Sequence, residues 1–197
     1  GEILVKDKTV WSGNYNKPEI NANTFIDGWF RTGDAGKLVD GKHLYMTDRL
    51  KDLFKTSNGK YIAPQQIETI LGGDVFIEQV AVIGNNRNYV TAIIAPNIEA
   101  IKGYAEQNGI KYEYVDELMD NPQICKMMEE RIANLQKDMA PYEKIKKFRM
   151  IKRGFSIESG ELTSTLKLRR AVILQNYAAM IEEMYNPVQG PLGGYAK

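Results

Sequence analysis

Three charged positions in this sequence have residue types that bind nucleotides and phosphate groups. Asp34 is predicted to emerge from a turn flanked by Gly33 and Gly36, where its carboxylate could accept hydrogen bonds from two neighbouring hydroxyls, as a ribose diol offers. Lys167 follows a turn-like segment and could meet a phosphate as a point charge. The stretch 48–52 is charged at almost every position and includes Arg49. Each signal also has an ordinary alternative, which is turn chemistry for Asp34 and solvated surface for the other two.

The elements that would position Asp34 and Arg49 are short strands and turns within the first fifty residues. The Asp40-Gly41 pair between two apolar stretches predicts a β-hairpin, because glycine reaches the positive φ that tight hairpin turns require. His43 would then lie on a hairpin strand. No acid or nucleophile lies near His43 in the sequence, which favours a half-exposed strand residue over a catalytic one.

The remainder of the chain alternates between helical and strand-like patterns. Pro64 predicts the start of a short helix that ends at Gly72-Gly73. Residues 76–84 and 88–96 are rich in β-branched residues and surround a polar turn, which predicts an antiparallel pair. Further elements are expected in order along the chain: helices over about 97–107 and 116–139, a basic strand within 144–153, a helix over about 165–185 and a tail over 187–197.

The basic stretch 144–153 allows two interpretations. Lysines and arginines alternate there with Phe148, Met150 and Ile151. Charges on the outer face of a strand usually meet only solvent. The alternative is a patch that meets a small polyanion, such as the nucleotide end of coenzyme A.

Composition excludes several classes of protein. The 197 residues are 43% hydrophobic and 26% charged, with a net charge of +1, so nonspecific binding of nucleic acid is not expected. One cysteine and one histidine exclude a disulfide framework and a His/Cys zinc site. No apolar run is long enough for a membrane span, and no signal peptide is recognisable, so we expect a cytoplasmic protein.

These patterns predict an α+β fold in which a central antiparallel sheet is flanked by helices. We expect a β-rich segment over 1–50, a mixed domain over 51–186 and a flexible tail over 187–197. Fifty residues of strands bury little surface alone, and the chain opens with Gly1 instead of methionine. We therefore expect the chain to be a piece of a longer protein.

Taken in order, the motifs resemble the C-terminal part of the acyl-adenylate-forming superfamily, the AMP-forming acyl-CoA synthetases. The resemblance covers most of the chain and is closest to fatty acid–CoA ligases of the long-chain type. It is carried by four segments: YNKPE (15–19), GWFRTGD (28–34), DRLKDLFKTSNGKYIAPQQIE (48–68) and GELTSTLKLRR (160–170).

The resemblance implies a role for each matched position in the first half-reaction, in which ATP and a fatty carboxylate form an acyl adenylate. Asp34 would bind the ribose hydroxyls of ATP or the acyl adenylate, and Arg49 would face the ribose and phosphate region. Tyr45 and Met46 would line the nucleotide pocket. Lys167 would be the catalytic lysine, which bridges the oxygens around the α-phosphate as charge shifts in the transition state.

The resemblance also implies a second half-reaction, in which coenzyme A attacks the adenylate after the small domain rotates. Lys51 would be the hinge of this rotation. Lys55, Asn58 and Gly59 would approach the pantetheine channel, although a tight turn is the ordinary interpretation of Asn58-Gly59.

The resemblance implies fatty acid, ATP or AMP, coenzyme A and Mg²⁺ as substrates and cofactor. The Mg²⁺ ligands, the phosphate loop and the acyl pocket would lie in a large N-terminal domain upstream of Gly1, which would be the partner of this chain. Peripheral contact with a membrane is compatible with a long-chain substrate. The alternatives are an adenylating enzyme for another acyl group or acceptor, and a non-catalytic module that binds a nucleotide or a partner protein.

Overall fold

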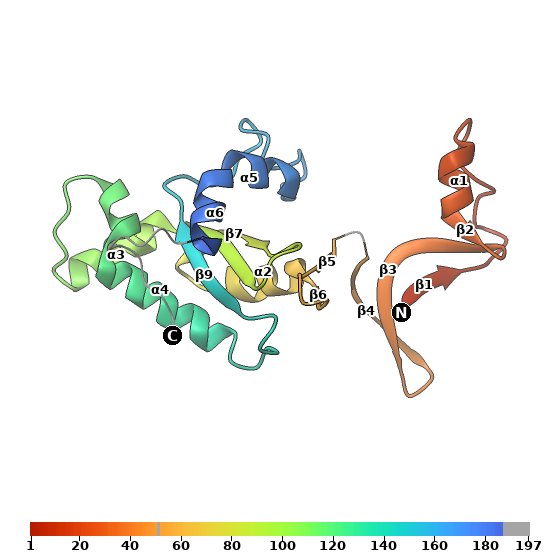
Figure 1. The fold of residues 1–197 in the computed structure, drawn as a ribbon, viewed down its shortest axis with the longest axis horizontal. Helices are drawn as coiled ribbons and strands as arrows, with labels where there is room; N and C mark the ends of the chain where they lie inside the picture. Colours follow the sequence, from red (N-terminus) through yellow and green to blue (C-terminus); the bar gives the residue numbers. More distant parts are fainter. Residues whose placement is uncertain (51, 187–197) are drawn as a thin grey trace. The chain divides into compact units, whose positions relative to one another are not determined.

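The structure, a computed structural model, describes residues 1–50 and 52–186, apart from the side chains of residues 47 and 48. The chain divides into two compact units, which are treated separately below (Figure 1). The first unit is Gly1–Phe54, and the second begins at Lys55. This boundary falls close to the one predicted after residue 50, while the assignment of the units to enzyme domains stays a prediction. The predicted tail over 187–197 lies outside the described residues.

A four-stranded sheet forms the first unit. The long strand β3 (Trp29–Val39) pairs in antiparallel fashion with all the others, namely β1 (Glu2–Val5), β2 (Phe25–Ile26) and β4 (His43–Arg49). Helix α1 (Pro18–Thr24) precedes β2. The predicted hairpin is confirmed between β3 and β4, where Asp40 and Gly41 have φ values of 52° and 63°.

Packing in the first unit is thin. The rings of Trp11, Phe25 and Phe30 form an aromatic cluster, with ring centroids 4.6–6.2 Å apart. Among the residues of this unit whose burial is described, only Phe54 is buried, with 7% of its surface exposed. The low burial of this unit therefore agrees with the expectation that these strands bury little surface by themselves.

The second unit is built on a three-stranded sheet in the order β7-β8-β9. Strands β7 (Ile77–Ile83) and β8 (Val90–Pro96) form the predicted antiparallel pair. Strand β9 (Ile145–Met150) joins β8 in parallel, with Val90 opposite Ile145, so the central sheet is mixed. The mixed α+β class is confirmed. The parallel pair was not predicted, because β9 reaches the sheet only after a long crossover that contains helices.

Helices cover both faces of this sheet (Figure 1). On one face, alternate strand residues such as Ala81 and Ile93 pack with Ile173 and Ile181 from α5 (Arg170–Asn176) and α6 (Ala178–Tyr185). On the other, α2 (Pro64–Gly72) packs against β7 and also contacts α4 (Pro122–Leu135). Every residue of β8 is buried, as expected for a central strand with both faces covered.

Helix α3 (Ile98–Gln107) confirms the helix expected over 97–107, with the Asn97 side chain accepting a hydrogen bond from Ala100 N at 3.2 Å. The helix expected over 116–139 is shorter and divided. A 3₁₀ helix, η1 (Val115–Asp120), precedes α4, and Asn121 caps α4 by accepting from Gln123 N and Ile124 N. Pro122 explains the division, because proline lacks the N–H that a continuous helix needs and suits the first helical position.

The helix expected over 165–185 is wrong at its start. Residues 163–168 form a tight loop, and helical structure begins only at Arg170 and is interrupted at Tyr177. The Thr163 hydroxyl accepts a hydrogen bond from Lys167 N at 3.0 Å, and Leu166 has a φ of 60°. A threonine side chain that binds nearby backbone competes with the helix, which explains the loop.

Candidate functional site

Asp34 lies within strand β3, which corrects the prediction that it emerges from a turn. It is directly opposite Arg49, the last residue of β4. Arg49 Nε is 3.5 Å from Asp34 Oδ1, and 23% of the Asp34 side chain is exposed, against 64% for Arg49. Sheet pairing therefore brings together two residues that the sequence placed fifteen positions apart.

The two glycines beside Asp34 shape the strand instead of ending it. Gly33 has a φ of 74°, and its carbonyl accepts from Leu50 N at 2.7 Å. The register shifts between Ala35 and Gly36. A Cβ at Gly36 would lie 2.9 Å from Ile3 Cδ1 and from Tyr45 O, so the strand closes tightly there.

Tyr45 and Met46 lie on β4, a few residues before Arg49. Tyr45 pairs with Lys37 and Met46 with Gly36 in the hairpin register. Both side chains are exposed, at 54% and 68%. Strand β4 thus carries an exposed aromatic ring and an exposed thioether in addition to Arg49.

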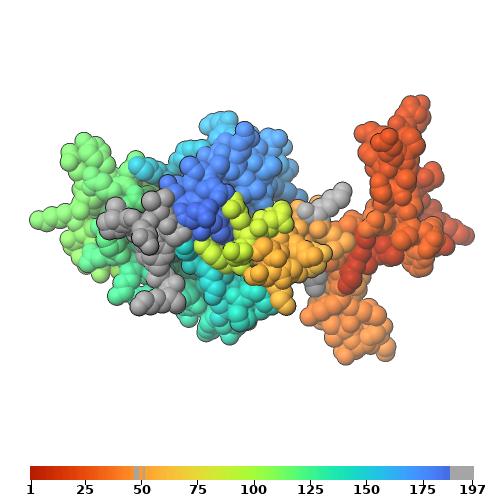
Figure 2. Space-filling model, in the orientation of Figure 1, coloured from red at the N-terminus to blue at the C-terminus, as the bar shows by residue number. Residues whose placement is uncertain are grey.

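Lys55 lies on β5 (Phe54–Lys55), which pairs with β6 (Tyr61–Ile62). The Lys55 ammonium is 5.6 Å from the centre of the Tyr61 ring. This small hairpin lies on the surface of the second unit, where its atoms are yellow to orange in Figure 2. The lysine is therefore held against an exposed aromatic ring.

Asn58 and Gly59 form the tip of the β5–β6 hairpin. Gly59 has a φ of 79°, and its N–H donates to Thr56 O at 2.9 Å. Asn58 Nδ2 donates to Asn88 O at 3.2 Å, and Ser57 Oγ donates to Asn88 Oδ1 at 2.7 Å. Hydrogen bonds therefore hold this tip against the turn between β7 and β8, so both residues serve a tight turn.

Lys167 lies on the loop that precedes α5 in the second unit. Its backbone is fixed by hydrogen bonds with Thr163, from Thr163 N to Lys167 O at 2.8 Å and from Lys167 N to Thr163 Oγ1 at 3.0 Å. The side chain is exposed. Within 1–50 and 52–186, no ion pair is found for its ammonium. The geometry suits a lysine offered to a group outside this unit.

One feature of this loop was missed by sequence reasoning. Glu161, at the base of the loop, is fully buried and binds the guanidinium of Arg153. The only signal in the sequence is a glutamate beside Gly160 in the motif 160–170. Burial of that glutamate is a tertiary property, because its partners come from the 153–159 segment and from Asn176 on helix α5.

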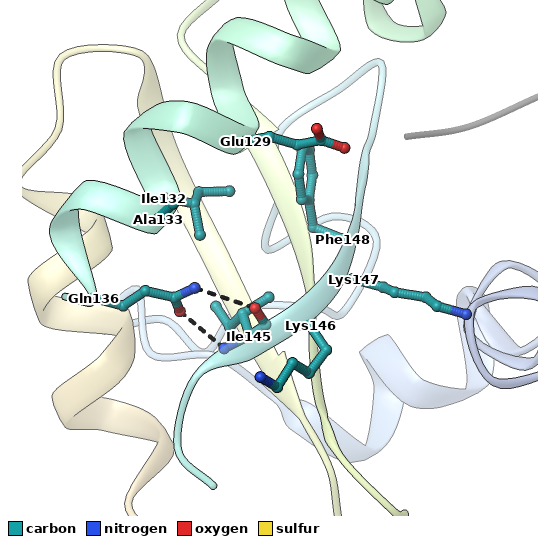
Figure 3. A pocket seen from close by; sticks show the side chains of 8 residues that line it. All are labelled: Glu129, Ile132, Ala133, Gln136, Ile145, Lys146, Lys147 and Phe148. Atoms are coloured by element: carbon teal, nitrogen blue, oxygen red, sulfur yellow. Dashed lines mark hydrogen bonds between the residues drawn. The ribbon is translucent and has the colours of Figure 1, made fainter. Parts of the chain in front are cut away.

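The basic stretch 144–153 is largely occupied by contacts within the unit. Lys144 Nζ donates to Lys137 O at 3.0 Å, and Lys152 Nζ is 3.2 Å from Asp116 Oδ2. A shallow depression of about 50 Å³ lies between α4 and β9, lined in part by Lys146 and Lys147 (Figure 3). Lys147 turns away from it and donates to Met184 O at 2.8 Å. These contacts favour a structural role for much of the stretch.

The candidate residues fall in two groups. Asp34, Arg49, Tyr45 and Met46 belong to the first unit, whereas Lys55, Asn58, Gly59 and Lys167 belong to the second. Lys51, the predicted hinge, lies outside the described residues.

In the part of the chain that the structure describes, no cluster of histidine, cysteine and acidic residues could hold a metal ion. None of the described helices is long and apolar enough to cross a membrane.

Comparison with protein families gives a match over residues 51–189 to a family described as AMP-binding enzyme C-terminal domain. Among curated proteins, the chain is 32% identical over 187 residues to the long-chain-fatty-acid–CoA ligase FadD15 of Mycobacterium tuberculosis, covering 94% of this chain and 31% of that protein. It is 32% identical to human long-chain-fatty-acid–CoA ligase 1, covering 96% of this chain and 28% of that protein. The chain thus spans less than a third of the length of these relatives.

Solved structures with the same fold include adenylation domains. The adenylation domain of a carboxylate reductase from Mycobacterium chelonae is 27% identical, with a TM-score of 0.77 over 94% of this chain and 28% of that one. The corresponding domain from Segniliparus rugosus, in complex with AMP and a co-purified carboxylic acid, is 25% identical, with the same TM-score and the same coverage.

Proposed function

The chain belongs to the AMP-forming acyl-CoA synthetase superfamily, and from this membership we propose that it is the C-terminal part of a long-chain fatty acid–CoA ligase. The observation that carries the proposal is an identity of about 32% to long-chain ligases across 94% of the chain, through both units. The proposed reaction has two steps. ATP and a fatty acid give an acyl adenylate and pyrophosphate, and coenzyme A then converts the adenylate into acyl-CoA and AMP.

In the first step, a carboxylate oxygen of the fatty acid forms a bond to the α-phosphorus, and the bond from that phosphorus to pyrophosphate breaks. Negative charge shifts onto the departing oxygen during this exchange. Lys167 is proposed to bind these oxygens through its ammonium, which stabilises the transition state more than the ground state. The exposed side chain on a hydrogen-bonded loop supports this role.

Asp34 is proposed to accept hydrogen bonds from the ribose hydroxyls, since an ionised carboxylate acts only as an acceptor. Arg49, next to it in the hairpin, supplies donors in a rigid fork that suits several oxygens at once. Tyr45 and Met46 are proposed to line the nucleotide pocket, and the exposure of both side chains supports this placement.

In the second step, the thiol of coenzyme A loses its proton to solvent or a base, its sulfur bonds to the acyl carbon, and AMP leaves. Lys51 is proposed as the hinge that lets the second unit present a different face for this step. Lys55, Asn58 and Gly59 are proposed to approach the pantetheine arm. Their position on an exposed hairpin of the second unit supports this role.

The proposed partners are fatty acid, ATP and coenzyme A, together with a large N-terminal domain of the same protein. Mg²⁺ would neutralise the phosphate charges of ATP. No described residue of this chain fits as part of a metal-binding cluster, so we assign no Mg²⁺ ligand to it. A cytoplasmic location with peripheral contact to a membrane is part of the proposal, because long acyl chains partition into bilayers.

A second candidate is an adenylating enzyme whose acyl group passes to another acceptor. The observation that favours it is the likeness to the adenylation domains of carboxylate reductases. The two functions share the first step and differ in the acceptor.

The experiment that separates the two functions is to follow AMP and the acyl product when the complete protein receives palmitate, ATP and coenzyme A. Palmitoyl-CoA supports the ligase, whereas palmitoyl adenylate that persists despite coenzyme A supports the second candidate.

A further inference from the structure

Glu161 is a buried charge with an unusually complete set of donors. Its side chain is fully buried. Arg153 donates to both carboxylate oxygens, from Nη1 to Oε2 at 2.8 Å and from Nη2 to Oε1 at 2.9 Å. Ser159 Oγ donates to Oε2 at 2.6 Å, and Asn176 Nδ2 donates to Oε1 at 3.0 Å. Such a set offsets the high cost of removing a carboxylate from water.

The carboxylate stays ionised at neutral pH. Burial by itself would raise the pKa of Glu161, but the hydrogen bonds from Arg153, Ser159 and Asn176 outweigh it and lower the pKa to about 2. The charge that orients these donors is therefore permanent under ordinary conditions.

The backbone of the same residue begins the loop that carries Lys167. Glu161 N donates to Ser156 O at 3.1 Å, and Glu161 O accepts from Arg169 N at 2.7 Å. One step further in, Leu162 and Leu168 form an isolated antiparallel bridge. Glu161 therefore closes the loop at its base, with Lys167 two residues before the other end.

The base of this loop is fixed and its tip is exposed. Leu162 is buried in the apolar cluster beneath α5 and α6, and Leu168 packs against that cluster. Lys167 itself is exposed. Asn176, at the end of α5, ties the Glu161 carboxylate to the helix that follows the loop. A shift of the base would thus move the lysine relative to everything that it faces.

Docking of α5 onto the sheet has its own ion pair. Arg170 Nη1 donates to Glu68 Oε1 and to Val82 O, both at 2.7 Å. The buried Glu161 is not needed to make that contact. Its donors instead lie on the 153–159 segment and on Asn176, on either side of the loop in the sequence.

We propose that Glu161 is a positioning residue, whose buried carboxylate holds the loop so that Lys167 reaches the geometry required for adenylate formation. The inference rests on the ligase function proposed above, because it needs Lys167 to act in the first step. Misplacement of a catalytic group by about 1 Å can cost about 100-fold in rate. The effect of losing Glu161 should therefore fall on one half-reaction and not on the other.

The test uses Glu161→Gln in the complete ligase. Adenylate formation is measured as palmitate-dependent exchange of pyrophosphate into ATP, and thioester formation as the reaction of synthetic palmitoyl adenylate with coenzyme A. We expect kcat for adenylate formation to fall about 10- to 100-fold. The KM for ATP and the rate of thioester formation should stay within about twofold of wild type. Arg153→Lys, which keeps the charge but loses the fork, should give an intermediate loss.

Glu68→Gln is the matched control, because Glu68 is the carboxylate partner of Arg170, a second arginine near the loop. It should lower thermal stability without changing the ratio of the two half-reactions. The inference is overturned if Glu161→Gln folds and forms adenylate at the wild-type rate, if both half-reactions fall equally, or if Glu68→Gln changes the ratio as strongly. Should Glu161→Gln fail to fold, the ratio of adenylate formation to thioester formation is measured in Arg153→Lys instead. A selective loss of adenylate formation then supports the inference, and an unchanged ratio overturns it.

Failure of the proposed function has a different signature. A wild-type protein without palmitate-dependent exchange overturns the ligase function and this inference together. Exchange in the wild type with an unchanged ratio in Glu161→Gln and Arg153→Lys overturns the positioning role alone.

Discussion

Asp34 and Arg49 face each other across the β3–β4 hairpin, and Arg49 Nε lies 3.5 Å from Asp34 Oδ1. With 64% of the Arg49 side chain exposed, the pair adds little to the stability of the fold. Both groups are nevertheless held by adjacent strands, so their spacing does not depend on loop motion. A carboxylate acceptor and a guanidinium donor at this spacing suit a ligand with hydroxyls beside a phosphate.

Asp34→Asn should weaken the use of ATP while leaving the fold intact. The variant keeps the shape of the side chain but loses the charge that strengthens hydrogen bonds to the ribose hydroxyls. We expect the KM for ATP to rise about tenfold or more, since a charge-assisted hydrogen bond is worth about 1.5–3 kcal/mol. Steady-state kinetics of the complete protein measures the effect. Asp40→Asn, on the exposed hairpin turn, is the control, and an equal rise there would remove the ribose role.

Lys167→Ala should abolish most adenylate formation. Removal of one group that stabilises transition-state charge typically costs about 100- to 1,000-fold in kcat. Thioester formation from synthetic palmitoyl adenylate should continue, because the α-phosphate exchange is then complete. Single-turnover assays separate the steps, with Lys111→Ala at another exposed site as the control. Adenylate formation at the wild-type rate in Lys167→Ala would contradict the catalytic role.

Lys51→Pro tests the hinge. Proline fixes φ near −65°, so a rotation that requires another backbone angle is blocked. We expect adenylate formation to survive and thioester formation to slow severalfold, because only the second step needs the rotated arrangement. Rapid mixing of preformed adenylate with coenzyme A gives the second rate. Equal losses in both steps would show that residue 51 is not the hinge.

Acid should weaken the fold through Glu161. The pKa of this group is about 2 in the folded chain, below the ordinary glutamate value of 4.5, so ionisation stabilises the folded state. That contribution, roughly 3 kcal/mol, is complete above about pH 4.5 and is lost as the pH falls toward 2. Thermal unfolding between pH 7 and pH 3 should show a steeper loss for wild type than for Glu161→Gln. Parallel curves for wild type and Glu161→Gln would contradict the lowered pKa of Glu161. The control Glu158→Gln, at an exposed position, should follow wild type.

Local patterns predicted most elements of the fold. The Asp40-Gly41 hairpin, the β7–β8 pair and the helix start at Pro64 all depend on neighbouring residues, and all are present. The parallel pairing of β9 with β8 joins residues that are far apart in the sequence, such as Val90 and Ile145, so no local pattern predicts it. The loop at 163–168 was missed for a different reason. The helical spacing of apolar residues gives no sign of the hydrogen bond from Lys167 N to Thr163 Oγ1.

The candidate site was predictable only in part. Ordered motifs singled out Asp34, Arg49 and Lys167 as candidates, and the flanking glycines led to the wrong prediction that Asp34 lies in a turn. Gly33 and Gly36 instead permit a positive φ and a close strand contact within β3. Glu161 could not have been found, because glutamate is rarely buried and its partners meet only when the chain folds.

The measurement that tests the central claim most directly is product analysis by mass spectrometry after the complete protein receives palmitate, ATP and coenzyme A. The ligase account predicts palmitoyl-CoA and AMP in equal amounts, with both lost in Lys167→Ala. Formation of ADP in place of AMP, or palmitoyl adenylate that coenzyme A does not consume, would contradict it.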